Sequence, residues 1–230
     1  MAYALQIPCI TRHYFPDTVE SIKKLCQAAG YQTHVPEGAT CCGLPYFEKG
    51  ELLQAKSIGE YNLSVYGQNQ VISISPKCCN TLSHHYPDIF NNTVSHNAAT
   101  QLARQLIGLP DLLKKIATER FKPVKAQYFF VSECCKADRL NPENIGIPGI
   151  TWLYSTLNPT CCGAGTSLPV SDHQLSIKMA IALLDSFKAS GAEAIVFEDD
   201  ICRKHVLNAA VSAQIELTHF HITDIIARAL

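Results

Sequence analysis

The stretches GATCCGLPYFEKG (residues 38–50) and NPTCCGAGTSLPV (residues 158–170) each contain two adjacent cysteines followed directly by glycine. The second triplet follows the first by 120 residues. Two further patterns recur at similar separations: VISISPKCC (71–79) matches AIVFEDDIC (194–202), and YALQIPC (3–9) matches QYFFVSECC (127–135). Three correspondences in the same order indicate an internal duplication.

Each half alternates short apolar strands with helices. The expected strands are YALQI (3–7), YQTHV (31–35) and VISIS (71–75), then AQYFFV (126–131), ITWLYS (150–155), AIVFE (194–198) and IELTHF (215–220). This alternation predicts an α/β fold made of two tandem duplicated units, each with a parallel sheet. The expected linker is RFKPVK (120–125), and we place the two units at residues 1–118 and 119–230.

The composition restricts the class of protein. The 230 residues are 47% hydrophobic and 17% charged, with a net charge of −1, as in a globular domain without the basic stripe of a nucleic-acid-binding protein. The chain shows no signal peptide and no apolar run of about 20 residues, so we expect a cytoplasmic protein without a membrane span. In a reducing compartment, 11 cysteines favour metal binding, catalysis or packing over disulfides.

Most of the cysteines follow predicted strands. In parallel α/β units the carboxyl ends of the strands form the functional edge of the sheet. We therefore expect one group of thiols per unit. The cysteines so placed are Cys9, Cys41, Cys42, Cys78 and Cys79 in the first half, and Cys134, Cys135, Cys161, Cys162 and Cys202 in the second. Cys26 lies on the apolar face of the first predicted helix, where a packing role is expected.

Thiolates in such numbers bind soft metals: zinc, copper(I) or iron–sulfur clusters. Zinc normally takes four ligands, whereas adjacent cysteines can reach different irons of one cluster. The glycine after each pair allows the backbone to approach sulfur and to direct an N–H group toward it. This chemistry favours a multi-iron cluster. It leaves open a zinc-binding structural subunit and a thiol redox sensor that uses the vicinal pairs.

The spacing of Cys9, Cys41-Cys42-Gly43 and Cys78 resembles that of the cysteine-rich CCG-domain proteins. HVPEGATCCGLP (34–45) and CCGAGTSLPV (161–170) look most like the lactate-utilisation protein A branch of Fe–S oxidoreductase subunits. The resemblance implies an electron-transfer subunit with one or two [4Fe–4S] clusters, active in lactate or 2-hydroxy-acid oxidation. Its implied partners are a ferredoxin-type Fe–S subunit, a flavin dehydrogenase subunit, or both. The alternative is a catalytic protein like the CCG-containing component of heterodisulfide reductase, which cleaves a disulfide at a noncubane cluster.

The resemblance also implies the ligands. The implied metal ligands are Cys9, Cys41, Cys42, Cys78, Cys135, Cys161, Cys162 and Cys202, and the further cofactor contacts are Cys79 and Cys134. Thr81 and His205 stand where the family pattern has its last cysteine. The units could therefore hold four-ligand sites, or sites in which Cys79 and Cys134 supply a fifth thiolate. Cubane and noncubane clusters, and zinc in one half, stay open, and no catalytic residue is assigned.

Overall fold

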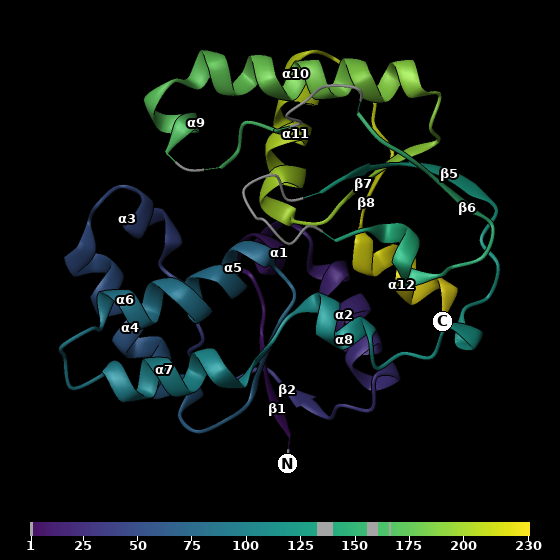
Figure 1. Ribbon diagram of the computed structural model, residues 1–230. Coiled ribbons are helices and arrows are strands. Elements are labelled where there is room, and N and C mark those ends of the chain that lie inside the picture. Colours follow the sequence, from purple (N-terminus) through teal and green to yellow (C-terminus); the bar gives the residue numbers. More distant parts are fainter. Residues whose placement is uncertain (1, 133–139, 156–160, 166) are drawn as a thin grey trace. The chain divides into compact units, whose positions relative to one another are not determined.

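The computed structural model describes residues 2–132, 140–155, 161–165 and 167–230 (Figure 1). The chain divides into two compact units, residues 1–115 and 116–230, which are described separately below. No helix in the described ranges is both long enough and apolar enough to cross a membrane.

Unit 1 contains a parallel sheet in the order β2-β1-β3-β4. Its strands are β1 (Tyr3–Gln6), β2 (Thr33–His34), β3 (Val71–Ser73) and β4 (Leu106–Ile107). The two central strands are fully buried apart from Tyr3, because they are covered on both faces. In their register Ala4 lies beside Val71 and Gln6 beside Ser73.

The connections of unit 1 are helical. They are α1 (Cys9–Tyr14), α2 (Pro16–Ala28), α3 (Leu44–Glu48), α4 (Leu52–Tyr66), α5 (Pro76–Asn80), α6 (Tyr86–Ile89), α7 (His96–Gln105) and α8 (Leu109–Leu113). A π-helical turn, Thr81–His85, joins α5 to α6. Helices α4, α6 and α7 cover one face of the sheet and α2 lies on the other (Figure 1). The chain adds β2 on one side of β1 and then β3 on the other side. Because the crossovers are right-handed, this change of side places the connecting helices on opposite faces of the sheet.

Unit 2 repeats this sheet order as β6-β5-β7-β8, again with all strands parallel. Its strands are β5 (Ala126–Val131), β6 (Ile150–Leu153), β7 (Ala194–Phe197) and β8 (His219–His221). Its helices are α9 (Leu168–Ser171), α10 (His173–Ser190), α11 (Asp200–Ser212) and α12 (Ile222–Ala229), with 3-10 turns at Thr118–Arg120 and Pro142–Ile145.

Alternation along the strands separates the two faces of this second sheet. Phe129 and Ile195 pack with α10 and α11 in one core cluster that also contains Cys162 and Cys202. Phe220 points to the opposite face, where the Arg228 guanidinium of α12 lies 4.1 Å from its ring centre. The face that α10 and α11 cover is thus the one where Cys162 and Cys202 are buried.

The expected architecture is confirmed: two α/β units, each with a four-stranded parallel sheet, and the described cysteines of the motif follow the carboxyl ends of strands. Strand β4 was not predicted, because only its residues 106 and 107 are strand, directly after a helix. Cys134 and Cys135 lie outside the described residues.

Candidate functional site

Four cysteines of unit 1 come together from three connections. Cys9 begins α1 after β1, Cys41 and Cys42 lie in the loop after β2, and Cys78 lies in α5 after β3. Side-chain hydrogen bonds join Cys9 with Cys41, Cys42 with Cys41, and Cys42 with Cys78. We call these residues the four-thiol group. Their meeting follows from the parallel sheet, which brings three strand ends to the same edge.

The four thiols strongly influence each other's ionisation. Hydrogen bonds from Cys42 and Cys9 lower the pKa of Cys41 to about 3. The hydrogen bond to Cys41, together with burial, raises the pKa of Cys9, and hydrogen bonds to Cys41 and Cys78 raise that of Cys42. One thiolate therefore forms readily, and each further thiolate is opposed by its neighbours. A bound cation removes this opposition, because metal binding deprotonates coordinating thiols.

The donor set therefore fits a soft metal centre. Within the described ranges, however, no three His, Cys, Asp or Glu side chains are grouped as the ligands of one metal ion would be. The thiols of the four-thiol group contact one another in series instead of surrounding one point. Their chemistry suits a centre with several metal atoms at least as well as a single ion.

The glycine of each triplet has a left-handed backbone, with φ of 87° at Gly43 and 81° at Gly163. Its N–H donates to the sulfur two residues earlier, at 3.5 Å in the first unit and 3.4 Å in the second. The N–H···S contact expected from the sequence is therefore present in both triplets. Such contacts stabilise negative charge on sulfur.

The two glycines differ in the room around them, which gives a testable contrast. A Cβ on Gly163 would lie 2.5 Å from the Ser176 carbonyl oxygen, whereas the nearest atom to a Cβ on Gly43 is 3.5 Å away. Gly43→Ala should cost about 1–2 kcal/mol of unfolding free energy from the left-handed backbone alone. Gly163→Ala adds a backbone clash and should cost clearly more. Chemical denaturation of both variants checks the order; equal losses would contradict it.

Asn62 of α4 holds the first triplet in place. Its side-chain amide donates to the Cys41 carbonyl oxygen at 2.8 Å and to the Tyr86 hydroxyl at 3.2 Å, and its oxygen accepts from the Thr40 N–H. The Tyr86 hydroxyl in turn donates to the Cys42 carbonyl oxygen at 3.0 Å. Asn62 and Tyr86 are buried. Neither was predicted from the sequence, although a buried asparagine within an expected helix is a signal of such a role.

A different pair holds the second triplet. The Ser176 hydroxyl of α10 donates to the Gly163 carbonyl oxygen at 2.8 Å, and His205 Nε2 lies 3.1 Å from that hydroxyl. Cys162 and Cys202 are buried, and the Cys162 thiol is directed at the Cys202 sulfur. Hydrogen bonds to Cys161 and Cys202 raise the pKa of Cys162, as in the first unit. Cys161 is half-buried beside them.

The positions that carry cysteine in the family pattern have other contacts here. The Thr81 hydroxyl donates to the Lys77 carbonyl oxygen at 2.9 Å within its own helix. His205, at the corresponding position of the second unit, contacts Ser176. Cys79 donates its thiol to the Ser73 carbonyl oxygen at 3.0 Å. Cys26 is buried in α2, where desolvation raises its pKa to about 11.

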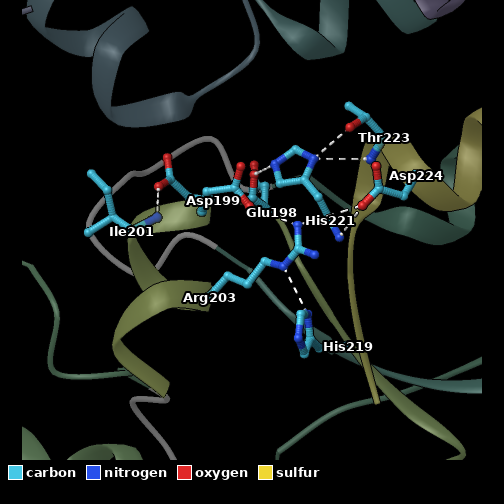
Figure 2. A network of polar contacts seen from close by, with 9 residues as sticks. Glu198, Asp199, Ile201, Arg203, His219, His221, Thr223 and Asp224 are labelled. Carbon is cyan, nitrogen blue, oxygen red and sulfur yellow. Dashed lines mark hydrogen bonds and ion pairs between the residues drawn. The ribbon is translucent and has the colours of Figure 1, made fainter. Parts of the chain in front are cut away.

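A buried polar network fixes the start of α11, the helix that carries Cys202 (Figure 2). The Asp199 carboxylate accepts from the Ile201 N–H at 2.8 Å and so caps the helix. The Arg203 guanidinium lies 3.2 Å from Asp200 and 3.6 Å from Asp224, and its Nε donates to His219 at 3.0 Å. Arg203 thus has two carboxylate partners, one in α11 itself and one in α12.

A cavity of about 390 Å³ opens beside the four-thiol group. It gives access to two of the thiols, since Cys9 is exposed and Cys41 half-buried. Its lining residues are Ile7, Cys9, Ile10, Arg12, His13, Tyr14, Thr40 and Cys41. Arg12 is held in place by a hydrogen bond from its Nη1 to the Ala39 carbonyl oxygen at 2.8 Å.

Comparison with known proteins shows the family to which the chain belongs. Lactate utilization protein A 2 of Bacillus cereus is 20% identical over 240 residues, which span 100% of this chain and 99% of that protein. Lactate utilization protein A of an Exiguobacterium species is 24% identical over 220 residues, 88% of this chain and 87% of its own. The CCG cysteine-rich domain matches at residues 3–83 and again at 146–206, once in each unit. The chain therefore belongs to the CCG cysteine-rich domain family.

Proposed function

We propose that this protein is an iron–sulfur electron-transfer subunit of an oxidoreductase complex. The four-thiol group of unit 1, with its contacts from Cys9 through Cys41 and Cys42 to Cys78, is the observation that carries the proposal. These residues would hold a cluster in unit 1, and Cys135, Cys161, Cys162 and Cys202 would hold one in unit 2. A cluster, when bound, supplies one-electron redox chemistry.

The protein's own residues would set the properties of such a cluster. Gly43 and Gly163 donate N–H groups to thiolate sulfur, and Asn62 and Ser176 fix the backbone of the two triplets. In unit 1 the Thr81 hydroxyl and the Cys79 thiol each donate a hydrogen bond to a backbone carbonyl oxygen. These contacts support a site with four cysteine ligands. We therefore favour four cysteine ligands over five in unit 1.

Lactate or another 2-hydroxy acid is the substrate that we assign to the complex. This assignment rests on full-length similarity to proteins named lactate utilization protein A. No dehydrogenase active site is proposed for this chain, so a flavin dehydrogenase or a ferredoxin-type Fe–S subunit would supply or accept the electrons. We also propose a cytoplasmic location, because a reducing compartment keeps cysteines available as ligands.

The cavity beside Cys9 and Cys41 favours a second candidate function, the cleavage of a disulfide as in heterodisulfide reductase. A small molecule in that cavity would lie against two of the proposed ligands. Reduction of an organic disulfide by the reconstituted protein with an artificial electron donor would support this function. A protein that transfers electrons to a partner but leaves disulfides intact would contradict it.

Metal analysis tests the main proposal. Protein purified without oxygen should contain iron and acid-labile sulfide in equal amounts and show an EPR signal after reduction. Zinc with negligible iron and sulfide would identify a structural zinc protein instead. Reversible thiol oxidation without any metal would identify a redox sensor. Either of these results would overturn the iron–sulfur proposal.

A further inference from the structure

One buried amide of unit 1 is only half satisfied. Gln6, at the end of β1, is 1% exposed, and its Oε1 accepts a hydrogen bond from the Ser73 hydroxyl at 2.5 Å. Its Nε2 is buried and has no hydrogen-bond partner. An amide nitrogen carries two N–H donors, and leaving them unpaired in the interior costs about 1–3 kcal/mol. The folded protein thus keeps a donor that lacks an acceptor among its own described groups.

The other unpaired polar atoms are of a different kind. Among the described residues they are His96 Nδ1, Thr100 Oγ1 and Gln105 Oε1, all on α7. These three side chains belong to half-buried residues, which lie nearer to solvent than Gln6 does. Gln6 is thus the fully buried case, and it requires an acceptor inside the protein.

The strand register places Gln6 on the side of the sheet that faces the first triplet. Gln6 and Ser73 are register partners, and alternation puts them on the same face as Ala4 and Val71. Ala4 and Val71 pack with Ala39, Tyr66 and Tyr86 in one core cluster.

That core cluster leads directly to the ligands. Ala39 stands two residues before Cys41, and the Tyr86 hydroxyl donates to the Cys42 carbonyl oxygen. On the strand side, Gln6 precedes Cys9 by three residues, and Ser73 precedes Cys78 by five. The Gln6 amide therefore lies at the carboxyl ends of the two central strands, which lead to Cys9 and Cys78.

We propose that Gln6 Nε2 donates a hydrogen bond to a sulfur atom of the metal cluster bound by Cys9, Cys41, Cys42 and Cys78. This inference rests on the proposed iron–sulfur function. Cluster sulfides and cysteine sulfurs accept N–H groups, and these contacts stabilise the reduced, more negative cluster. Gln6 is then a positioning and tuning residue that raises the reduction potential, while Ser73 fixes the orientation of its amide.

The test compares two changes in the full-length protein. The double variant Gln6→Leu/Ser73→Ala removes both hydrogen-bonding partners, so it leaves no new unpaired group and should fold. Gln6→Met keeps most of the side-chain volume and removes both N–H donors without adding a charge, and it leaves the Ser73 hydroxyl without this acceptor. Both variants should retain iron and sulfide, and in both the midpoint potential should shift to more negative values in an EPR-monitored redox titration.

A spectroscopic measurement makes the test independent of activity. In resonance Raman spectra the Fe–S bands of the unchanged protein should shift in D₂O, and this shift should shrink in both variants. Thr100→Val is the matched control, because it removes an unpaired hydroxyl on α7 and should change neither potential nor Raman bands.

The outcomes separate this inference from the function on which it rests. Variants with intact clusters and unchanged potential and Raman bands would overturn the role of Gln6 and leave the iron–sulfur proposal standing. Absence of iron and sulfide from the unchanged protein would overturn both.

Discussion

Cys42→Ser should remove the iron and acid-labile sulfide of unit 1 and leave those of unit 2 in place. Cys42 is buried and hydrogen-bonds both Cys41 and Cys78, so it occupies the middle of the four-thiol group. A serine hydroxyl is a poor ligand for the soft metals that thiolates prefer. Cys162→Ser should have the mirror effect, because Cys162 contacts Cys161 and Cys202 in the same way.

The chain offers matched controls for this experiment. Cys79→Ala removes a neighbouring thiol that donates to the Ser73 carbonyl oxygen, and Cys26→Ala removes a thiol buried in α2. Both variants should keep the full iron and sulfide content, measured with EPR after anaerobic purification. If Cys79→Ala lost as much iron as Cys42→Ser, the four-ligand assignment would be wrong.

Arg203→Met should destabilise unit 2 by about 3–5 kcal/mol, because it strips the positive partner from buried carboxylates. The guanidinium lies within 3.6 Å of both Asp200 and Asp224, and Arg203 and Asp200 are almost completely buried. Methionine preserves much of the side-chain volume, so the lost charge dominates the effect. The free energy of unfolding from urea titration provides the measurement.

Lys23→Met is the control for this second change. It removes an exposed ion pair with Glu20, at 2.7 Å, and should cost less than about 1 kcal/mol. A loss for Arg203→Met as small as that for Lys23→Met would show that the carboxylates find other compensation. Because the network fixes the start of α11, the Arg203 variant should also release iron from unit 2 more easily than the unchanged protein.

The sequence predicted the duplicated α/β architecture because strand alternation and cysteine spacing are local patterns that repeat. The position of both cysteines after a strand could not separate Cys78 from Cys79, and only the family spacing implied Cys78 as the metal ligand. Consecutive residues of a helix point about 100° apart, and only the packed structure decides which thiol faces its partners. In α5 Cys78 joins the four-thiol group, and Cys79 points to the end of β3.

The supporting residues were harder to predict for a related reason. Asn62 acts on a loop residue 21 positions earlier, and Gln6 pairs with Ser73 across two strands whose register the sequence does not state. Such contacts depend on tertiary packing, whereas propensity and spacing describe only neighbours along the chain. Cys134 and Cys135, both predicted at the site, lie outside the described residues, and their roles stay predictions.

The two triplets have the same kind of turn, but different side chains hold them in place. These are Asn62 and Tyr86 in the first triplet and Ser176 and His205 in the second. After a gene duplication, separate supporting residues allow the sequence of each unit to change without affecting the triplet of the other unit. Natural variation at Asn62 would leave the second copy intact, and variation at Ser176 would spare the first. Both copies thereby keep the same left-handed glycine although different side chains hold the turn.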